Sequence, residues 1–436
     1  MRILHVGNVA NNGYLNAKFQ RREGIEADAI CDETHILSLP EWEDADLHGP
    51  FEPYPNPDEL ARAGNWRRPP WILGPADPAA RRRFPGQFFL DGLARSYVEP
   101  LVRPSIAARV RKDYAPLEPV LGPLRPFDVN RGLLALQRFA LLWPEPQRLF
   151  GGYDVVEAYA THPILAYLAG AAPFVAFEHG TMRELPFEDS WRGRLLSVAY
   201  RLAAKVVITN PDVIGSARRL GLENTIFIPH PVDETKYTPG PSPFRTELGL
   251  AGGERLLVSP SSQTWHLKGN DALLRGFAEY LRGGGRSVLV LTDWGPDVER
   301  SRALACELGL EERLRWLAPL PKLRLIEAYR AADLVLDQFV LGTFGAIAPE
   351  AMACGTAVVM AFDPGVHEWC FPEPPPVIAA REPGEIAAAL TRLLGDDKER
   401  ERLGTASRRW VEEQHGWQLV TDRHRAVYEG ALGARQ

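Results

Sequence analysis

Short apolar runs rich in β-branched residues alternate along the chain with longer segments of helical hydrophobic spacing. This alternation is typical of a parallel sheet whose strands are joined by crossover helices. Two sets of runs are separated by residues 231–253, which are rich in Pro, Gly and polar residues. We predict strands at 2–7, 25–32, 153–160, 173–179, 205–210 and 225–229, and then at 255–260, 287–293, 313–317, 333–339, 357–362 and 376–380. The pattern therefore predicts an α/β protein with two successive units.

The domain boundaries follow from this spacing. We predict an N-terminal unit over 1–235 and a C-terminal unit over 236–412. Residues 413–436 have apolar positions at near-helical spacing, and we expect a final helix that packs back toward the N-terminal unit. Ligands of such folds bind at the carboxyl ends of the strands, and a crevice between two units is the expected place.

One stretch interrupts the alternation. Residues 40–146 contain 18 of the 38 prolines and lack regular strand and helix spacing. Proline removes a backbone donor and is excluded from helix interiors. We therefore expect irregular loops and short helices, inserted in the N-terminal unit.

The charge balance excludes one class of function and leaves a local question open. The 436 residues carry 50 Lys and Arg against 56 Asp and Glu, a net charge of −6, which argues against a nucleic-acid binder with a globally basic surface. Within 62–148, however, 15 basic residues face 7 acidic ones, and Arg81, Arg82 and Arg83 precede the aromatic run FPGQFF. This basic region is either a solvated face of the insertion or a surface for a phosphate-bearing acceptor or an anionic membrane.

Cysteine spacing and hydropathy bear on the compartment. Cys31, Cys306, Cys354 and Cys370 form no Cys-x-x-Cys pair and no zinc-ligand spacing, which fits a reducing cytoplasm. The N-terminus lacks the features of a signal peptide, and no stretch reaches the ~18 apolar residues of a membrane span. We expect a cytoplasmic protein, with peripheral contact at the inner membrane face through 62–148. Asp44-Ala-Asp46 is interpreted as a solvated acidic stretch, so no metal site is predicted.

Residues 334–362, LVLDQFVLGTFGAIAPEAMACGTAVVMAF, carry the strongest chemical signal. A predicted strand ends at Asp337, a loop with Gly342 and Gly345 follows, and a helix begins near Ile347. The glycines allow a ligand to approach the backbone, and a helix N-terminus attracts phosphate groups. Glu350 in the first turn could bind sugar hydroxyls, or it could simply complement the helix dipole.

The stretch FGAIAPEAMACGTAVV resembles the donor motif of the retaining nucleotide-sugar glycosyltransferases of GT-B fold, the glycosyl transferases group 1 or family 4-like. The resemblance implies two Rossmann-like domains whose parallel sheets face each other across a cleft. In that family two glutamates lie eight positions apart, and the second corresponds to Glu350, which would hold the ribose. The first falls on Gly342, so this chain departs from the pattern. It is similar to a D-Q…G-x-[FY]-G variant, in which backbone amides of 342–345 or Asp337 would substitute.

The rest of the second half resembles the same family in order. SPSSQTWHLKGNDALLRGFAEYL (259–281) is similar to the segment whose Lys-Gly pair begins a helix, which would place Lys268 on the donor diphosphate. A mobile point charge at a loop–helix junction suits a pyrophosphate. The family's companion arginine is missing, since Gln263, Trp265 and His266 occupy the approach. The turn at 318–320 is where the nucleotide base would rest.

The first half matches less tightly. GNVANNGY (7–14) resembles the family's glycine-containing loop facing the donor sugar, and a tight strand-to-helix turn is the alternative. FEHGTM (177–182) is similar to the strand-end His-Gly of the family, where His179 would face the sugar, although a lone histidine is often structural. The resemblance implies catalytic roles for His179, Lys268 and Glu350. The donor-binding residues that it implies are Asn12, Gly13, Ser262, Lys268, Pro319, Leu320, Gly342, Thr343, Phe344, Gly345, Ala346, Ile347 and Glu350.

The family resemblance implies transfer of a sugar from a nucleoside-diphosphate sugar, of UDP or GDP type, to an acceptor hydroxyl with retention of configuration. The acceptor would be a glycan, a lipid-linked group or a small molecule in bacterial surface-glycan or natural-product biosynthesis. No metal, no other cofactor and no nucleic acid are expected. Two alternatives stay open: a non-catalytic relative that binds a sugar nucleotide or glycan, and a GT-B sugar-nucleotide epimerase. The sequence does not choose the sugar, the base or the acceptor.

Overall fold

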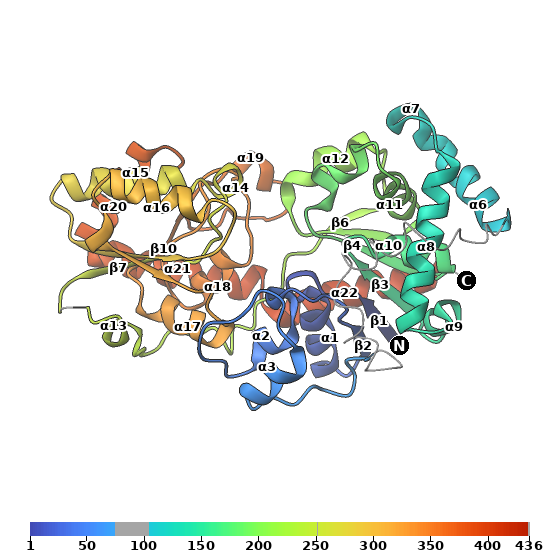
Figure 1. Ribbon diagram of the computed structural model, residues 1–436, viewed down its shortest axis with the longest axis horizontal. Coiled ribbons are helices and arrows are strands. Elements are labelled where there is room, and N and C mark those ends of the chain that lie inside the picture. Colours follow the sequence, from blue (N-terminus) through green and yellow to red (C-terminus); the bar gives the residue numbers. More distant parts are fainter. Residues whose placement is uncertain (75–103, 251, 435–436) are drawn as a thin grey trace. The chain divides into compact units, whose positions relative to one another are not determined.

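The computed structural model describes residues 1–74, 104–250 and 252–434, which form two compact units (Figure 1). Unit 1 consists of Met1–Trp42, Pro53–Pro229 and Val420–Gln436. Unit 2 consists of Glu43–Glu52 and His230–Leu419. The change from unit 1 to unit 2 at 229/230 lies a few residues before the predicted boundary at 235/236. The return to unit 1 at 419/420 lies a few residues after the predicted boundary at 412/413.

Each unit is built on a six-stranded parallel sheet. In unit 1 the order is β2-β1-β3-β4-β5-β6 and in unit 2 it is β12-β11-β10-β7-β8-β9. The strands of unit 1 are β1 Arg2–Val6, β2 Glu26–Ile30, β3 Val155–Tyr159, β4 Phe174–Glu178, β5 Lys205–Ile208 and β6 Thr225–Phe227. Those of unit 2 are β7 Arg255–Ser259, β8 Ser287–Thr292, β9 Leu314–Leu317, β10 Leu334–Leu336, β11 Val358–Met360 and β12 Ile378–Ala379. Each lies within a predicted strand, so the predicted α/β class with two parallel sheets is confirmed.

The helices of unit 1 correct one expectation. They are α1 Asn12–Arg22, α2 Pro40–Asp44, α3 Pro57–Ala63, α6 Pro104–Tyr114, α7 Glu118–Leu121, α8 Pro126–Leu142, α9 Pro146–Gly151, α10 Pro163–Ala169, α11 Trp191–Leu202, α12 Ile214–Arg219 and α22 Trp417–Gly433, of which Pro40–Trp42 and Val420–Gly433 are the parts of α2 and α22 within the unit. Residues 104–142 are thus mainly helical and not irregular. Within the predicted insertion 40–146, Pro57, Pro126 and Pro146 stand at the first helical position, where a missing N–H costs nothing. Arg81, Arg82, Arg83 and FPGQFF lie outside the described residues.

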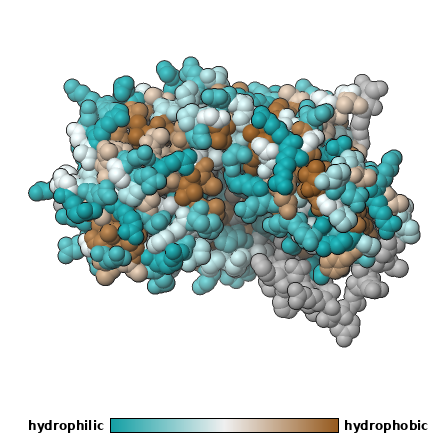
Figure 2. Space-filling view, turned by 90° about the horizontal axis from the view of Figure 1, so that it is seen from above, coloured by the Kyte–Doolittle hydropathy of each residue, from teal (hydrophilic) through white to brown (hydrophobic). Residues whose placement is uncertain are grey.

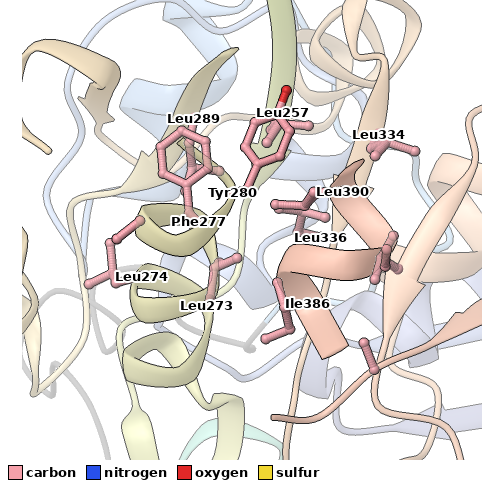
Figure 3. Packing of buried hydrophobic residues seen from close by; sticks show 14 of the residues in the cluster. Leu257, Leu273, Leu274, Phe277, Tyr280, Leu289, Leu334, Leu336, Ile386 and Leu390 are labelled. Carbon is pink, nitrogen blue, oxygen red and sulfur yellow. The ribbon is translucent and has the colours of Figure 1, made fainter. Parts of the chain in front are cut away.

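Unit 2 is organised around the packing of α15 against α20 and the sheet. Its helices are α13 Phe244–Glu247, α14 Trp265–Lys268, α15 Asn270–Arg282, α16 Val298–Glu307, α17 Lys322–Ala331, α18 Ile347–Ala353, α19 Pro364–His367, α20 Pro383–Gly395 and α21 Asp397–Gln414. Helices α15, α16 and α20 cover one side of the sheet, and α17 and α18 lie on the other (Figure 1). Figure 3 shows Phe277 of α15 and Leu390 of α20 pointing toward strand residues such as Leu257 and Leu336. Burial of these apolar side chains stabilises the sheet that carries the candidate site.

Helix α22 completes the core of unit 1. Val420, Val427 and Tyr428 pack with Tyr14 of α1 and with the apolar residues of the sheet. The final helix was predicted from this spacing of apolar residues. Its described part from Val420 onward belongs to unit 1, although almost 200 residues of unit 2 precede it in the sequence.

A buried polar network ties α22 to the sheet. The Glu157 carboxylate on β3 accepts hydrogen bonds from the hydroxyl groups of Tyr159 (2.9 Å) and Tyr428 (2.7 Å). His5 Nδ1 and His424 Nδ1 each lie 3.2 Å from a carboxylate oxygen, and Glu157 has no exposed area. Burial alone would raise the pKa of Glu157, but the charge and hydrogen bonds of His424 and His5 outweigh it and hold the pKa well below its usual range.

Both ring nitrogens of His5 lie against oxygen atoms of this network. Its Nε2 lies 2.9 Å from Gln20 Oε1, and the amide nitrogen of Gln20 donates to Tyr428. Its Nδ1 lies 2.8 Å from the hydroxyl oxygen of Tyr159 and 3.2 Å from Glu157 Oε2. His5 on β1, Glu157 on β3 and Tyr428 on α22 thus form one buried polar cluster in the core of unit 1.

We predict that Glu157→Gln lowers the free energy of unfolding of unit 1 by about 3 kcal/mol, because it removes a buried carboxylate that two tyrosine hydroxyls and two histidine rings contact. Chemical unfolding at pH 7 measures the loss, and Glu26→Gln on the exposed surface of β2 is the matched control. A carboxyl group with a lowered pKa stabilises the fold above its unfolded pKa, near 4.5, and that contribution is lost as the pH falls through the folded pKa. The difference between wild type and variant should therefore shrink below pH 4.5. An equal effect of both substitutions would contradict the network's role.

The surface does not present a continuous apolar face in the view of Figure 2, where apolar residues lie in small groups separated by polar ones. Exposed large apolar side chains occur singly, for example Phe127 and Leu141 of α8 and Leu202 of α11. Among the helices in the described ranges, none is long and apolar enough to cross a membrane.

Candidate functional site

The loop after β10 lies at the carboxyl edge of the unit 2 sheet, where parallel α/β sheets bind their ligands. Gln338 shapes this loop, because its side-chain amide donates to the Thr343 carbonyl while its Oε1 accepts from Lys268 Nζ at 3.1 Å. The backbone N–H of Phe339 donates to the carbonyl of Lys268 at 2.8 Å. Gly342 adopts φ +65°, a conformation that favours glycine. The structure therefore brings predicted residues Lys268, Gly342 and Thr343 together around Gln338.

Asp337 lies at the base of this loop and is buried. Its Oδ1 accepts from Ser261 Oγ at 3.2 Å, and its Oδ2 has no hydrogen-bond partner among the described residues. Burial raises the pKa of Asp337, and the nearby Lys268 ammonium opposes this. The protonation of the Asp337 carboxyl therefore affects the net charge next to the Lys268 ammonium. Ser262, also predicted to bind donor, has its hydroxyl 3.0 Å from that of Thr264.

Glu350 occupies a separate part of unit 2. Its carboxylate pairs with Lys322 and accepts from the hydroxyl of Tyr329 at 3.3 Å. Burial raises the pKa of Glu350, which the Lys322 charge counteracts. Lys322 begins α17 directly after the turn containing Pro319 and Leu320. The predicted base turn and Glu350 are therefore linked by Lys322, a residue that sequence reasoning missed and that no local signal singled out.

The four residues after Thr343 differ in what they expose. Phe344 is buried and packs against the rings of Phe371 (6.4 Å between centroids) and Trp410 (5.7 Å), which makes its side chain a core element. Its backbone is the part that a ligand could reach. Gly345 is half-buried and Ala346 is exposed, and Ile347 begins α18. The side chain of Phe344 thus orders the loop, and the exposed backbone follows it.

In unit 1 the loop after β1 is held by asparagine side chains. Asn8 donates to the Ser38 carbonyl (2.6 Å) and to Asn11 Oδ1 (2.9 Å), and its own Oδ1 accepts from the Tyr14 N–H (2.7 Å). Ala10 and Asn11 both adopt positive φ, 50° and 61°, a cost that these contacts offset. Such a fixed loop presents its residues at the carboxyl edge of the sheet.

The predicted residues Gly13, Asn12 and His179 come together at this edge. Gly13 lies so close to the Gly7 carbonyl that any side chain would clash with backbone. Asn12 Nδ2 lies 3.4 Å from His179 Nδ1. Burial, together with the Arg183 charge, lowers the pKa of His179 to about 4. The lowered pKa makes His179 a neutral imidazole at pH 7.

We predict that the ring of His179 does not titrate between pH 8 and pH 5.5, which histidine ring NMR signals would show, with His179→Asn used for assignment. Arg183→Ala should raise the pKa of His179, because it removes a neighbouring positive charge. Titration of wild-type His179 with a midpoint near 6.5 would contradict this description.

One group of described residues has atoms spaced like metal ligands: Asp32, Glu33 and His162. His162 Nε2 lies 2.9 Å from Asp32 Oδ2, and its Nδ1 lies 3.1 Å from the Tyr159 carbonyl. Burial would lower the pKa of His162, but Asp32 outweighs it and raises the pKa to about 9. An imidazolium has no lone pair for a metal, so these residues form an ion-paired cluster as they stand.

Comparisons with known proteins agree with this architecture. Residues 243–410 match the family model of glycosyl transferases group 1. A D-inositol 3-phosphate glycosyltransferase of Nocardia farcinica is 40% identical over 187 residues, 41% of each chain. D-inositol 3-phosphate glycosyltransferase 1 of Catenulispora acidiphila is 32% identical over 312 residues, 65% of this chain and 73% of that protein. The crystal structure of Anabaena HepE with UDP and glucose superposes with a TM-score of 0.63 at 16% identity, covering 98% of this chain and 99% of that chain.

These findings fix the fold and the family. The two Rossmann-like units define a GT-B protein. The chain belongs to the glycosyl transferases group 1, which confirms the resemblance seen in the sequence. Four of the curated D-inositol 3-phosphate glycosyltransferases are matched over 41%, 52%, 54% and 54% of their own length, so the chain spans about half of these relatives.

Proposed function

We propose that the protein is a glycosyltransferase that moves a sugar from a nucleoside-diphosphate sugar, of UDP or GDP type, to an acceptor hydroxyl with retention of configuration. The observation that carries the proposal is Lys268, held beside the glycine-bearing loop at the carboxyl edge of unit 2 in a chain of this family. The names of similar proteins support it: several are glycosyltransferases, and HepE was crystallised with UDP and glucose.

The proposed chemistry needs a site that stabilises a departing diphosphate. The bond between the anomeric carbon and the phosphate oxygen breaks while a bond to the acceptor oxygen forms, and the acceptor proton passes to a phosphate oxygen. A fixed cation and backbone amides that face this oxygen lower the barrier by preorganised electrostatics. Lys268 and the backbone around Gly345 are the groups proposed for this role.

The remaining predicted residues have proposed binding roles. Glu350 would hold the ribose and the turn at Pro319 and Leu320 the base. Asn12 and Gly13 would contact the transferred sugar, as would the ring of His179. No metal or further cofactor is part of this proposal. The acceptor is proposed to be a glycan, a lipid-linked group or a small molecule of a bacterial biosynthetic pathway in the cytoplasm.

We predict that Lys268→Ala weakens binding of the nucleoside diphosphate about tenfold or more, because a charge-assisted contact to phosphate is lost. Turnover with a suitable acceptor, followed as released nucleoside diphosphate across a panel of nucleotide sugars, should fall further still. Lys398→Ala on exposed α21 is the matched control. Wild-type affinity in the Lys268 variant would place the diphosphate elsewhere.

For Glu350→Gln, which keeps the side-chain shape, we predict about tenfold weaker binding of a ribonucleoside diphosphate. The dideoxy analogue, which lacks both ribose hydroxyls, should bind the variant and the wild type equally. Isothermal titration calorimetry measures both affinities, with Glu401→Gln as an exposed control on α21. Equal losses for both nucleotides would mean that Glu350 acts through the fold and not through the ribose.

A second candidate is a binding protein without turnover, because Gly342 stands where the family's first glutamate is expected and the companion arginine is absent. Tight donor binding with no release of diphosphate for any acceptor would favour it. Release of diphosphate that depends on an acceptor would favour the transferase.

A further inference from the structure

The space beside Gly342 is filled by the side chain of Arg381. A Cβ at position 342 would overlap Nη2 of Arg381, and it would lie 3.4 Å from the Cβ of Asp363. Arg381 follows β12 at the same edge of the sheet, and its Nη1 donates to the Val340 carbonyl at 2.5 Å. The glycine therefore makes room for a guanidinium group on the loop between β10 and α18.

Lys268 and Arg381 have no carboxylate at ion-pair distance among the described residues, whereas several other half-buried cations of unit 2 do. Arg255, for instance, pairs with Asp333 at 3.0 Å, and Arg400 with the same carboxylate at 3.5 Å. Among the described residues, no Asp or Glu oxygen lies within 4.0 Å of the Lys268 ammonium or the Arg381 guanidinium, although both residues are half-buried. Glu385 accepts from the backbone N–H of Arg381 at 2.8 Å, and this hydrogen bond and the Arg381 charge contribute to lowering the Glu385 pKa.

Both cations contact the same short stretch of loop. The Lys268 ammonium donates to the Gln338 side chain, and the Lys268 carbonyl accepts from the Phe339 N–H. The Arg381 guanidinium donates to the Val340 carbonyl. Gly269, directly after Lys268, approaches Val340 as well, since a Cβ there would lie 3.2 Å from Val340 Cγ2. Two half-buried positive charges thus contact residues 338–342. Such charges are stable when an anion neutralises them.

We propose that Arg381 is the second cation of the donor site and that, with Lys268, it binds an anionic group of the donor beyond the nucleoside. The inference rests on the proposed function of this site as the place of a nucleoside-diphosphate sugar. The anionic group is a phosphate of the diphosphate or a carboxylate on the transferred sugar. Lys268 is the single Lys or Arg between Ser259 and Asn270. A second positive charge beside the Lys268 ammonium therefore has to come from another segment of the chain.

The test compares Arg381→Ala with Arg282→Ala, a matched control on an exposed residue at the far end of α15. Calorimetry at low salt measures the affinities of UDP, GDP, UMP, GMP, UDP-glucose and UDP-glucuronate for wild type and both variants. We expect Arg381→Ala to weaken the diphosphate about tenfold or more and to leave the monophosphate unchanged, if the phosphate is the contact. A loss confined to UDP-glucuronate would identify the sugar carboxylate.

Affinities in Arg381→Ala within twofold of the Arg282→Ala control, for all six ligands, would overturn the assignment of Arg381 while the proposed function stands. Failure of wild type to bind any of the six would instead overturn the proposed function and the inference that depends on it. The two failures are therefore distinguishable in one experiment.

Gly342→Ala gives an independent check, because its Cβ would displace the Arg381 guanidinium. We expect this variant to weaken the same ligand as Arg381→Ala, and the double variant to be no weaker than Arg381→Ala alone. Thermal unfolding of each variant shows whether the strained φ of alanine at 342 has disturbed the fold. Additive losses of affinity would mean that Gly342 acts through the loop backbone and not by making room for Arg381.

Discussion

Unit 1 depends on one buried carboxylate. The Glu157 carboxylate contacts His5 of β1, Tyr159 of its own strand and His424 of α22. Elements far apart in the sequence therefore meet on a single side chain. The hydroxyl groups of Tyr159 and Tyr428 both donate to its Oε2, and Gln20 in turn donates to the Tyr428 oxygen. The contacts of Tyr428 and His424 with Glu157 thus help to position α22 on the sheet.

Each unit has a candidate site in a loop at the carboxyl edge of its own sheet, the loop after β1 in unit 1 and the loop after β10 in unit 2, and side-chain amides hold both loops. In unit 1, asparagine amides hold a loop in left-handed conformations and orient a neutral His179. In unit 2, Gln338 bridges Lys268 and the loop after β10, and positive charge gathers there. A neutral hydrogen-bonding edge suits sugar hydroxyls, whereas a cationic edge suits phosphate or carboxylate groups. The division of charge between the units agrees with the proposed division of ligands.

The strands and the family were predictable because their signals are local. Runs of β-branched residues mark each strand, and the motif around Glu350 lies within a single strand–loop–helix segment. Irregular loops and short helices were expected in 40–146, but the length of α8 was not, because proline was interpreted as a breaker, although several prolines begin helices in the structure. The partners of the site residues were not predictable, since Lys322 lies 28 positions from Glu350 and Asn12 lies 167 from His179. Such pairs depend on the fold and leave no pattern in the sequence.

The discontinuity of unit 1 has a consequence for how the protein is made. During synthesis β1 to β6 precede residues 230–419 of unit 2, and the helix that carries His424 and Tyr428 follows them. Until then Glu157 and the sheet face that α22 will cover lack their last partners. Unit 2 is continuous apart from residues 43–52, whereas the sheet face of unit 1 that α22 covers stays uncovered until all of residues 230–419 have been made. Unit 1 would therefore be the part whose apolar surface chaperones meet during synthesis.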